Sequence, residues 1–238
     1  MKHRILVCTL AACCAHAGAA DCPPYVKHTP GGDYTRAEDR AGLSVVEKFH
    51  FSRAVETLTQ GMTGSLGADI SYTLEHFPNH HRALASMAKL ALRLKSAQPV
   101  GARYTVSCFF ERAIAFASHD VTARMVYGNY LLATGQETMA LEQLDAASRL
   151  APEQATIQYN LGLMYVKKKD YEKASAHAQK AYALGFPLPG LKNKLKAAGK
   201  WREPPPAVIE EQETKETKEA QKTQETPIPA TAVPAEKN

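Results

Sequence analysis

Histidine and cysteine are the residue types in this 238-residue sequence whose spacing could support chemistry, with nine and five copies respectively. Three histidines lie close together, at His76, His80 and His81, and imidazole nitrogens are common ligands of zinc. A zinc ion held there would fit a metal-dependent hydrolase or an enzyme accessory. However, Pro78 breaks any helix between them, so His76 and His80 do not share one helical face.

The surroundings of these histidines favour a structural role instead. The nearest carboxylates, Asp69 and Glu75, fit ordinary helix positions, and a zinc site needs further ligands. His80 and His81 follow a Pro-Asn turn, where side chains commonly cap the start of a helix. The sequence also lacks a glycine-rich phosphate loop, a Gly-x-Ser-x-Gly elbow and a His-Glu-x-x-His helix. We therefore predict no enzyme activity, no catalytic residue, no bound metal and no cofactor.

Residues 1–20 have the pattern of an export signal. They run from a basic start through a short apolar stretch to small residues, which is the order of a secretory signal peptide cleaved near Ala20. We therefore expect a periplasmic or secreted protein. The run from Leu10 to Cys13 also resembles the lipobox of bacterial lipoproteins. In that alternative Cys13 is lipidated, and the protein is a lipid-anchored assembly factor.

Removal of residues 1–20 leaves two cysteines, Cys22 and Cys108. In an oxidising compartment two thiols most simply form one disulfide, which predicts a Cys22–Cys108 bond. The alternative is a buried thiol at Cys108, within an apolar helix, and a loose thiol at Cys22. Two cysteines so far apart do not by themselves make a metal site.

Composition and charge exclude several classes of protein. Apolar residues make up 45% of the chain, which is too many for a wholly disordered protein, and the longest apolar stretch is too short to cross a membrane. The net charge of +5 is modest and does not indicate a nucleic-acid partner. It is spread unevenly, with +7 in residues 21–202 and −4 in residues 203–238.

The middle of the chain repeats with a fixed period of about 34 residues, which is a length typical of helical repeats. A shift by one period superimposes small and apolar positions, namely Gly128 on Gly162, Ala140 on Ala174, Ala147 on Ala181 and Leu150 on Leu184. Within each unit the apolar residues recur at three- and four-residue steps, which is typical of amphipathic helices. A fixed period of this length predicts stacked units of two helices each.

This pattern resembles the tetratricopeptide repeat (TPR), whose first helix carries Leu-Gly and then Tyr and whose second carries two alanines before a proline. Residues 155–188 match at Leu161, Gly162, Tyr165, Ala174, Ala181 and, one place late, Pro187. Residues 121–154 match at Gly128, Ala140, Ala147 and Pro152, with Tyr127 and Leu131 where Leu and Tyr are usual. The resemblance implies an all-α helix-turn-helix solenoid, and an ordinary helical bundle is the alternative.

Further elements must flank two repeats, because two alone bury too little surface. Residues 69–120 fit degenerate TPR-like helices over 81–93 and 104–117, separated by an insertion of about six residues near Pro99. We interpret 189–202 as a capping helix and 203–238 as a disordered tail rich in Glu, Lys, Thr and Pro. Residues 21–68 form an irregular N-terminal extension in which only Ser52–Gln60 clearly predicts a helix, with Ser52 as its N-cap.

In TPR proteins the first helix of each repeat lines a groove that takes a peptide segment or a partner helix. Carried over by register, the resemblance implies a groove formed by Thr122, Met125, Asn129, Thr156, Tyr159, Asn160, Leu163 and Lys167. Asn129 and Asn160 stand where peptide-binding members use asparagine to hold a ligand backbone. The expected function is a scaffold or adaptor for another cell-envelope protein.

Two further blocks, 77–84 and 184–196, resemble those of exported proteobacterial TPR proteins of unestablished activity. That resemblance implies a periplasmic setting and no reaction. Lysines from Lys167 to Lys200 make the C-terminal end of the repeats basic. They fit either a solvated helical face or contact with an acidic partner, an anionic surface or the acidic tail.

Overall fold

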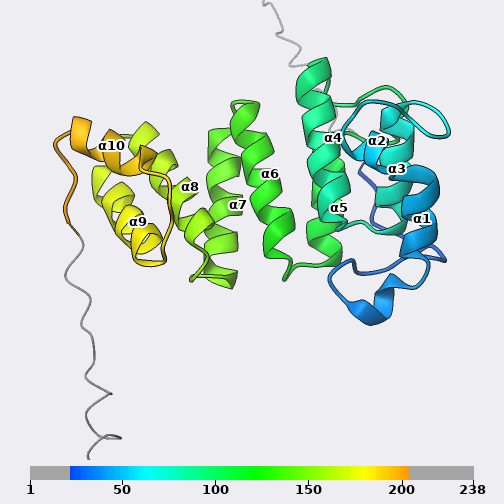
Figure 1. The fold of residues 1–238 in the computed structure, drawn as a ribbon, viewed down its shortest axis with the longest axis horizontal. Coiled ribbons are helices and arrows are strands. Elements are labelled where there is room, and N and C mark those ends of the chain that lie inside the picture. The colour runs from blue at the N-terminus through cyan, green and yellow to red at the C-terminus, as the bar shows by residue number, and fades with distance from the viewer. Residues whose placement is uncertain (1–21, 204–238) are drawn as a thin grey trace, which may run out of the picture. The chain divides into compact units, whose positions relative to one another are not determined.

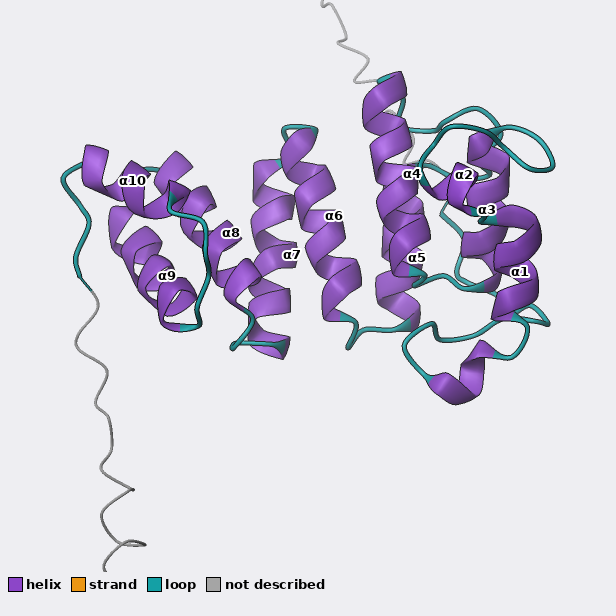
Figure 2. Ribbon diagram, in the orientation of Figure 1, coloured by secondary structure: helices purple, strands orange, loops and turns teal. Residues whose placement is uncertain are grey.

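A computed structural model describes residues 22–203, and every regular element in that range is a helix (Figures 1 and 2). The helices in chain order are η1 (Ala37–Arg40), α1 (Leu43–His50), α2 (Arg53–Glu56), α3 (Leu66–His76), α4 (His81–Leu94), α5 (Val106–Phe116), α6 (Val121–Ala133), α7 (Glu137–Leu150), α8 (Ala155–Lys167), α9 (Tyr171–Ala183) and α10 (Gly190–Ala197). The predicted all-α class is confirmed for this range. The predicted signal peptide and the predicted tail beyond Glu203 lie outside it.

The repeat period of the sequence is also the period of the helices. The interval from the start of α6 to the start of α8 equals the interval from α7 to α9, and both equal the shift that aligns Gly128 with Gly162. α6 packs along α7 and α8 along α9, while α7 contacts α8 and α4 contacts α6 (Figure 1). The longer connection between α4 and α5, over residues 95–105, holds the predicted insertion. Within the described residues, no helix is both long and apolar enough to cross a membrane.

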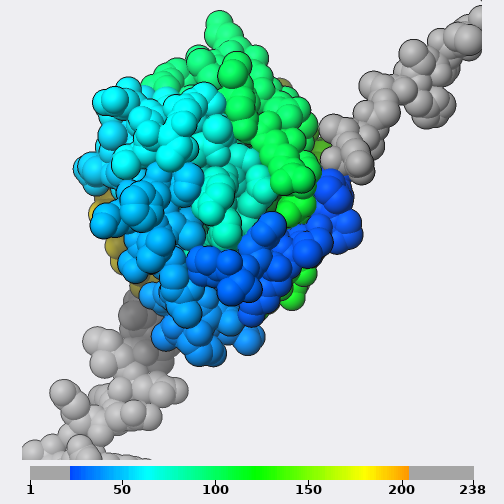
Figure 3. Space-filling view, turned by 90° about the vertical axis from the view of Figure 1, so that its right-hand side faces the viewer, coloured from blue at the N-terminus to red at the C-terminus, as the bar shows by residue number. Residues whose placement is uncertain are grey.

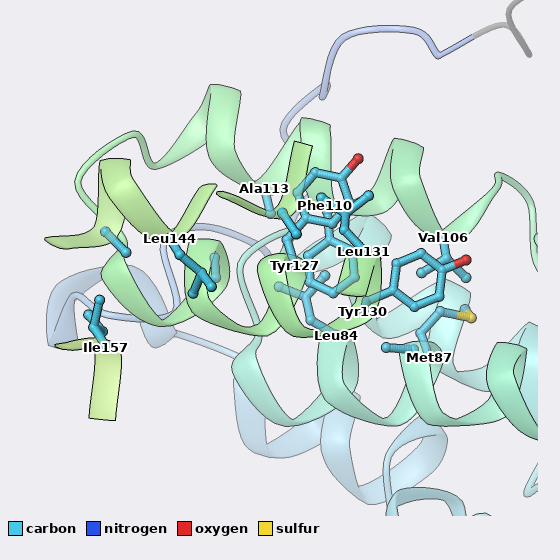
Figure 4. Close-up of a cluster of buried hydrophobic side chains, with 14 of the residues drawn as sticks. Leu84, Met87, Val106, Phe110, Ala113, Tyr127, Tyr130, Leu131, Leu144 and Ile157 are labelled. Carbon is cyan, nitrogen blue, oxygen red and sulfur yellow. The ribbon is translucent and has the colours of Figure 1, made fainter. Parts of the chain in front are cut away.

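Small residues allow neighbouring helices to approach closely. A Cβ placed on Gly128 of α6 would lie 2.9 Å from Cγ of Leu144 in α7, and one on Gly162 of α8 would lie 2.4 Å from Cδ2 of Leu191 in α10. Figure 4 shows the core that results, in which the rings of Phe110 and Tyr127 stack with their centroids 4.7 Å apart. Leu191 is fully buried, so α10 closes the apolar end of α8 and α9.

The N-terminal region is more helical than its sequence predicts. The sequence does not predict α1. Val45 and Phe49 are apolar but exposed, so the apolar residues around the buried Val46 do not follow the spacing of one buried helix face. The helix predicted over 52–60 is wrong in length: α2 ends at Glu56, and Leu58 takes a left-handed backbone conformation with φ of 60°. Ser52 does stand at the N-cap position of α2, as predicted, but its side chain makes no capping hydrogen bond. The predicted boundary between 68 and 69 falls inside α3.

The N-terminal segment, residues 22–42, is held against α3, α4 and α5. The predicted disulfide is confirmed, and it joins Cys22 to Cys108 in α5 with a Cα–Cα distance of 5.4 Å. The Tyr25 hydroxyl and the Gly32 N–H both donate to the carbonyl of His76 at the end of α3, each at 3.1 Å. Figure 3 shows this dark-blue segment lying across the surface of the helices that it contacts.

Candidate partner-binding surface

The predicted asparagines come together from α6 and α8, which are the first helices of two consecutive repeats. Thr122, Met125 and Asn129 are spaced by three and four residues and therefore share one face of α6. The Asn160 side chain of α8 reaches this face, where its Nδ2 donates to Oδ1 of Asn129 at 3.5 Å. The pairing joins successive repeats, since the two residues are 31 positions apart in the chain.

Seven of the eight predicted groove residues are exposed or partly exposed. Asn129, Thr156 and Lys167 are exposed, and Thr122, Met125, Asn160 and Leu163 are half-buried. We call these seven the α6–α8 surface. The side chains of Met125 and Leu163 pack against the core, so the α6–α8 surface has an apolar base beneath its polar side chains. At one end, Nζ of Lys167 lies 2.6 Å from Oε1 of Glu137, which neutralises the only lysine of the set.

The eighth residue, Tyr159, does not belong to this surface. It is only 9% exposed, and its ring stacks on Phe186 with a centroid distance of 4.1 Å. Its hydroxyl also lies against Gly190, where an added Cβ would be 2.7 Å away. The connection between α9 and α10 therefore covers Tyr159. The prediction was wrong here because helix register does not show what a later loop covers.

The asparagine pair keeps hydrogen-bonding capacity for a ligand. Among residues 22–203, Nδ2 of Asn129 and Oδ1 of Asn160 have no hydrogen-bond partner. A primary amide offers two donors and one acceptor, so the pair presents a donor beside an acceptor. That arrangement matches the C=O and N–H groups of an extended peptide.

The three clustered histidines point to separate partners. His76 Nδ1 contacts the carbonyl oxygen of Pro30, His80 Nε2 lies 3.0 Å from Glu47, and His81 Nε2 lies 2.8 Å from Asp120. Within the described part of the chain, no group of three or more His, Cys, Asp or Glu side chains is arranged to hold a metal ion. His80 is the N-cap of α4 and accepts the Ala83 N–H on Nδ1, as its turn position indicated.

A largely buried polar cluster of Asp33, Asn79, His81 and Asp120, here the Asn79 cluster, was not anticipated from the sequence. Asn79 is fully buried, and its Nδ2 donates to Asp33 Oδ1 at 2.8 Å and to Asp120 Oδ2 at 2.9 Å. Its Oδ1 accepts the Tyr34 N–H at 2.9 Å. One amide therefore ties the N-terminal segment to the starts of α4 and α6.

The carboxylates of this cluster stay ionised. Burial by itself raises the pKa of Asp120, but hydrogen bonds from His81, the Ala123 N–H and Asn79 outweigh it and hold that pKa below its usual value. Asp120 also caps α6 by accepting the Ala123 N–H. Its position directly before a helix was a usable sequence signal for the cap, whereas nothing nearby indicated Asn79 as a partner.

Asp69 is another residue whose role the sequence understated. The sequence favoured an ordinary helix position, but the side chain is fully buried. It accepts the Met62 N–H at 2.7 Å and the Thr63 hydroxyl at 2.6 Å, and it lies 3.2 Å from His50. Asp69 therefore fixes the glycine-containing loop before α3, because a buried carboxylate is stable only when such donors surround it.

No known family model matches this sequence, and a search of curated proteins finds no significant relative. The interpretation of each site therefore rests on its geometry.

The stability of the protein should fall in mild acid because of His80. Burial lowers the pKa of His80 from 6.5 to about 4, against the opposing pull of the Glu47 carboxylate. Its neutral ring donates from Nε2 and accepts on Nδ1, and protonation of Nδ1 would break the α4 cap. Between these two pKa values the unfolded chain binds a proton that the folded chain excludes, so folding weakens as pH falls through this window.

Urea unfolding at about pH 7 and about pH 4.5 tests this prediction. Between these two pH values, we expect the unfolding free energy of the wild type to fall by about 2–3 kcal/mol more than that of His80→Asn. The asparagine keeps a hydrogen-bond acceptor for the α4 cap but does not titrate. The lowered pKa values of Asp33, Asp69 and Asp120 affect both proteins alike, at lower pH. Equal losses in the two proteins would show that His80 does not cause the pH dependence.

Proposed function

We propose that this chain is a scaffold or adaptor of the tetratricopeptide-repeat type that binds a peptide segment or helix of another cell-envelope protein. The equal spacing of α6 with α8 and of α7 with α9 supports the repeat assignment. The close approach of helices at Gly128 and Gly162 supports it too, since the motif needs small residues there.

The observation that carries the binding proposal is the Asn129–Asn160 pair. These two amides touch across successive repeats, stand above Met125 and Leu163, and keep a donor and an acceptor for a ligand. A peptide backbone laid across them would gain hydrogen bonds, while its side chains would contact the apolar base.

We further propose that the protein works in the periplasm or outside the cell. The Cys22–Cys108 disulfide supports this location, because such bonds persist in oxidising compartments. The proposed signal peptide and the alternative lipidation of Cys13 both concern residues outside the described range. The intact mass of the mature protein distinguishes a chain that starts near Asp21 from one that starts at a lipidated Cys13.

Crosslinking in cells tests the binding proposal. Wild type and an Asn129→Ala/Asn160→Ala variant are crosslinked, purified from the envelope fraction and compared by quantitative mass spectrometry. The lost amide hydrogen bonds should reduce recovery of the true partner about 10-fold. The matched control is Asn193→Ala, which removes an exposed asparagine on α10 and should leave recovery unchanged.

The comparison of variants decides the outcome. A partner recovered equally with the double variant and with wild type would place the interface elsewhere on the chain and contradict the proposal. Circular dichroism of both variants confirms that a loss of partner does not reflect unfolding.

A further inference from the structure

A cavity of about 530 Å³ lies between the start of the N-terminal segment and the last turns of α5. Its lining residues are Cys22, Pro23, Pro24 and Tyr25 on one side and Glu111, Arg112, Ala115 and Phe116 on the other. The volume is within the range of small-ligand sites in proteins. The disulfide at one edge fixes the two walls relative to each other.

Arg112 is the unusual member of this lining. The residue is only 6% exposed, yet no Asp or Glu among residues 22–203 lies within ion-pairing distance of its guanidinium. The group lies over the ring of Tyr104, 4.5 Å from the ring centroid, and 5.9 Å from that of Tyr25. Its Nη1 donates to the Pro23 carbonyl at 2.9 Å. Buried arginines are normally paired with a carboxylate, so this cation lacks its usual counter-ion.

The free donors of Arg112 can take a carboxylate. A guanidinium has five N–H groups, and the bond to Pro23 uses one. The remaining donors suffice for the two parallel hydrogen bonds that a carboxylate accepts from arginine. Because the Arg112 side chain is itself buried, such a pair is stronger here than on an open surface.

The rest of the lining selects the kind of carboxylate. The rings of Tyr25 and Phe116 meet edge to face at a centroid distance of 4.7 Å, and Ala115 and the prolines complete an apolar wall. Glu111 adds a negative charge beside the cavity, which disfavours anions of higher charge such as phosphate. A singly charged ligand with an apolar body therefore fits best.

We propose that this cavity is a binding site for an apolar monocarboxylate, with the carboxylate on Arg112 and the apolar body against Tyr25 and Phe116. Two sources share this chemistry, namely a free organic acid and the C-terminal residue of a polypeptide. The site is separate from the α6–α8 surface and does not depend on the function proposed for that surface.

Isothermal titration of the mature full chain tests the proposal with defined probes. The probes are N-acetyl-Ala-Ala-Phe, 3-phenylpropionate and the amide of each, with inorganic phosphate as a further anion. We expect both acids to bind at least about 10-fold more tightly than their amides, because only the acids can pair with Arg112. Tighter binding of the peptide indicates a polypeptide C-terminus as the ligand, and tighter binding of the small acid indicates a free acid.

Two variants of different kinds keep the test independent of folding. Arg112→Gln removes the charge and should weaken acid binding at least about 10-fold. Since Arg112 also holds Pro23, Ala115→Trp provides a second route: it fills the cavity from an exposed position and should reduce binding similarly. Ala183→Trp, at an exposed position on α9, is the matched control and should bind like wild type.

Three outcomes would overturn the proposal. In the first, the acids and their amides bind with equal affinity. In the second, neither acid binds at concentrations up to about 10 mM, where even weak binding is detected. In the third, the folded Ala115→Trp protein binds the acids as tightly as wild type does. Competition by phosphate at concentrations similar to the acids would contradict the predicted preference for a single negative charge.

Discussion

Reduction of the Cys22–Cys108 disulfide is expected to lower the thermal unfolding midpoint by about 10 °C or more. The bond closes a loop between residues 86 positions apart. In the chain-entropy model, removal of a crosslink that closes a loop of this length lowers the unfolding free energy by about 4–5 kcal/mol. Each kcal/mol lowers the unfolding midpoint by about 2–4 °C for a protein of this size. Circular dichroism melts with and without dithiothreitol measure the shift.

A Cys22→Ser/Cys108→Ser variant controls for other effects of the reductant. It should melt near the reduced wild type, and dithiothreitol should leave its midpoint unchanged. A reduced wild-type protein that melts within about 2 °C of the oxidised form would show that non-covalent contacts alone hold the N-terminal segment. Those contacts include the hydrogen bonds from Tyr25 and Gly32 to His76.

Replacement of Asn79 by alanine should cost about 3–5 kcal/mol of unfolding free energy. The Asn79 side chain donates to two nearly buried carboxylates, Asp33 and Asp120, and accepts the Tyr34 N–H. Without the amide, both carboxylates lose a donor in a site with little access to water, and the Tyr34 N–H loses its acceptor. Urea unfolding at neutral pH measures the change.

The exposed Asn193 gives a control of the same chemical type. Asn193→Ala on α10 should change the unfolding free energy by less than about 0.5 kcal/mol. If Asn79→Ala also fell within about 1 kcal/mol of wild type, water or a rearranged side chain would have to replace the amide, and the Asn79 cluster would not be a principal support of the fold.

The repeats could be predicted because their determinants are local and periodic. Glycine and alanine at fixed positions, together with apolar residues three and four apart, specify α6 to α9 without knowledge of the rest of the chain. The same reasoning identified His80 as a capping residue, since capping depends on a few neighbouring residues. The disulfide followed from the predicted oxidising compartment and from the two cysteines that remain after residue 20.

The residues that sequence reasoning missed depend on contacts between distant segments. Asp33 and Asn79 are 46 positions apart, and Asn79 and Asp120 are 41 apart, so no window of sequence contains the Asn79 cluster. Tyr159 in α8 lies beneath a loop that begins only after the whole of α9. Arg112 is part of an ordinary Glu-Arg pair in sequence. Only its apolar neighbours Phe109 and Phe110 hinted at burial.

The separation of the two bonded cysteines also imposes an order during biosynthesis. The ribosome delivers the chain from its N-terminus, so Cys22 becomes available long before Cys108. Cys22 cannot form its bond to Cys108 until α1 to α4 and the start of α5 have been delivered. In a chain that stops short of residue 108, Cys22 lacks its partner, and thiol–disulfide exchange can join it to another cysteine. The closed bond therefore marks a chain that extends at least through Cys108.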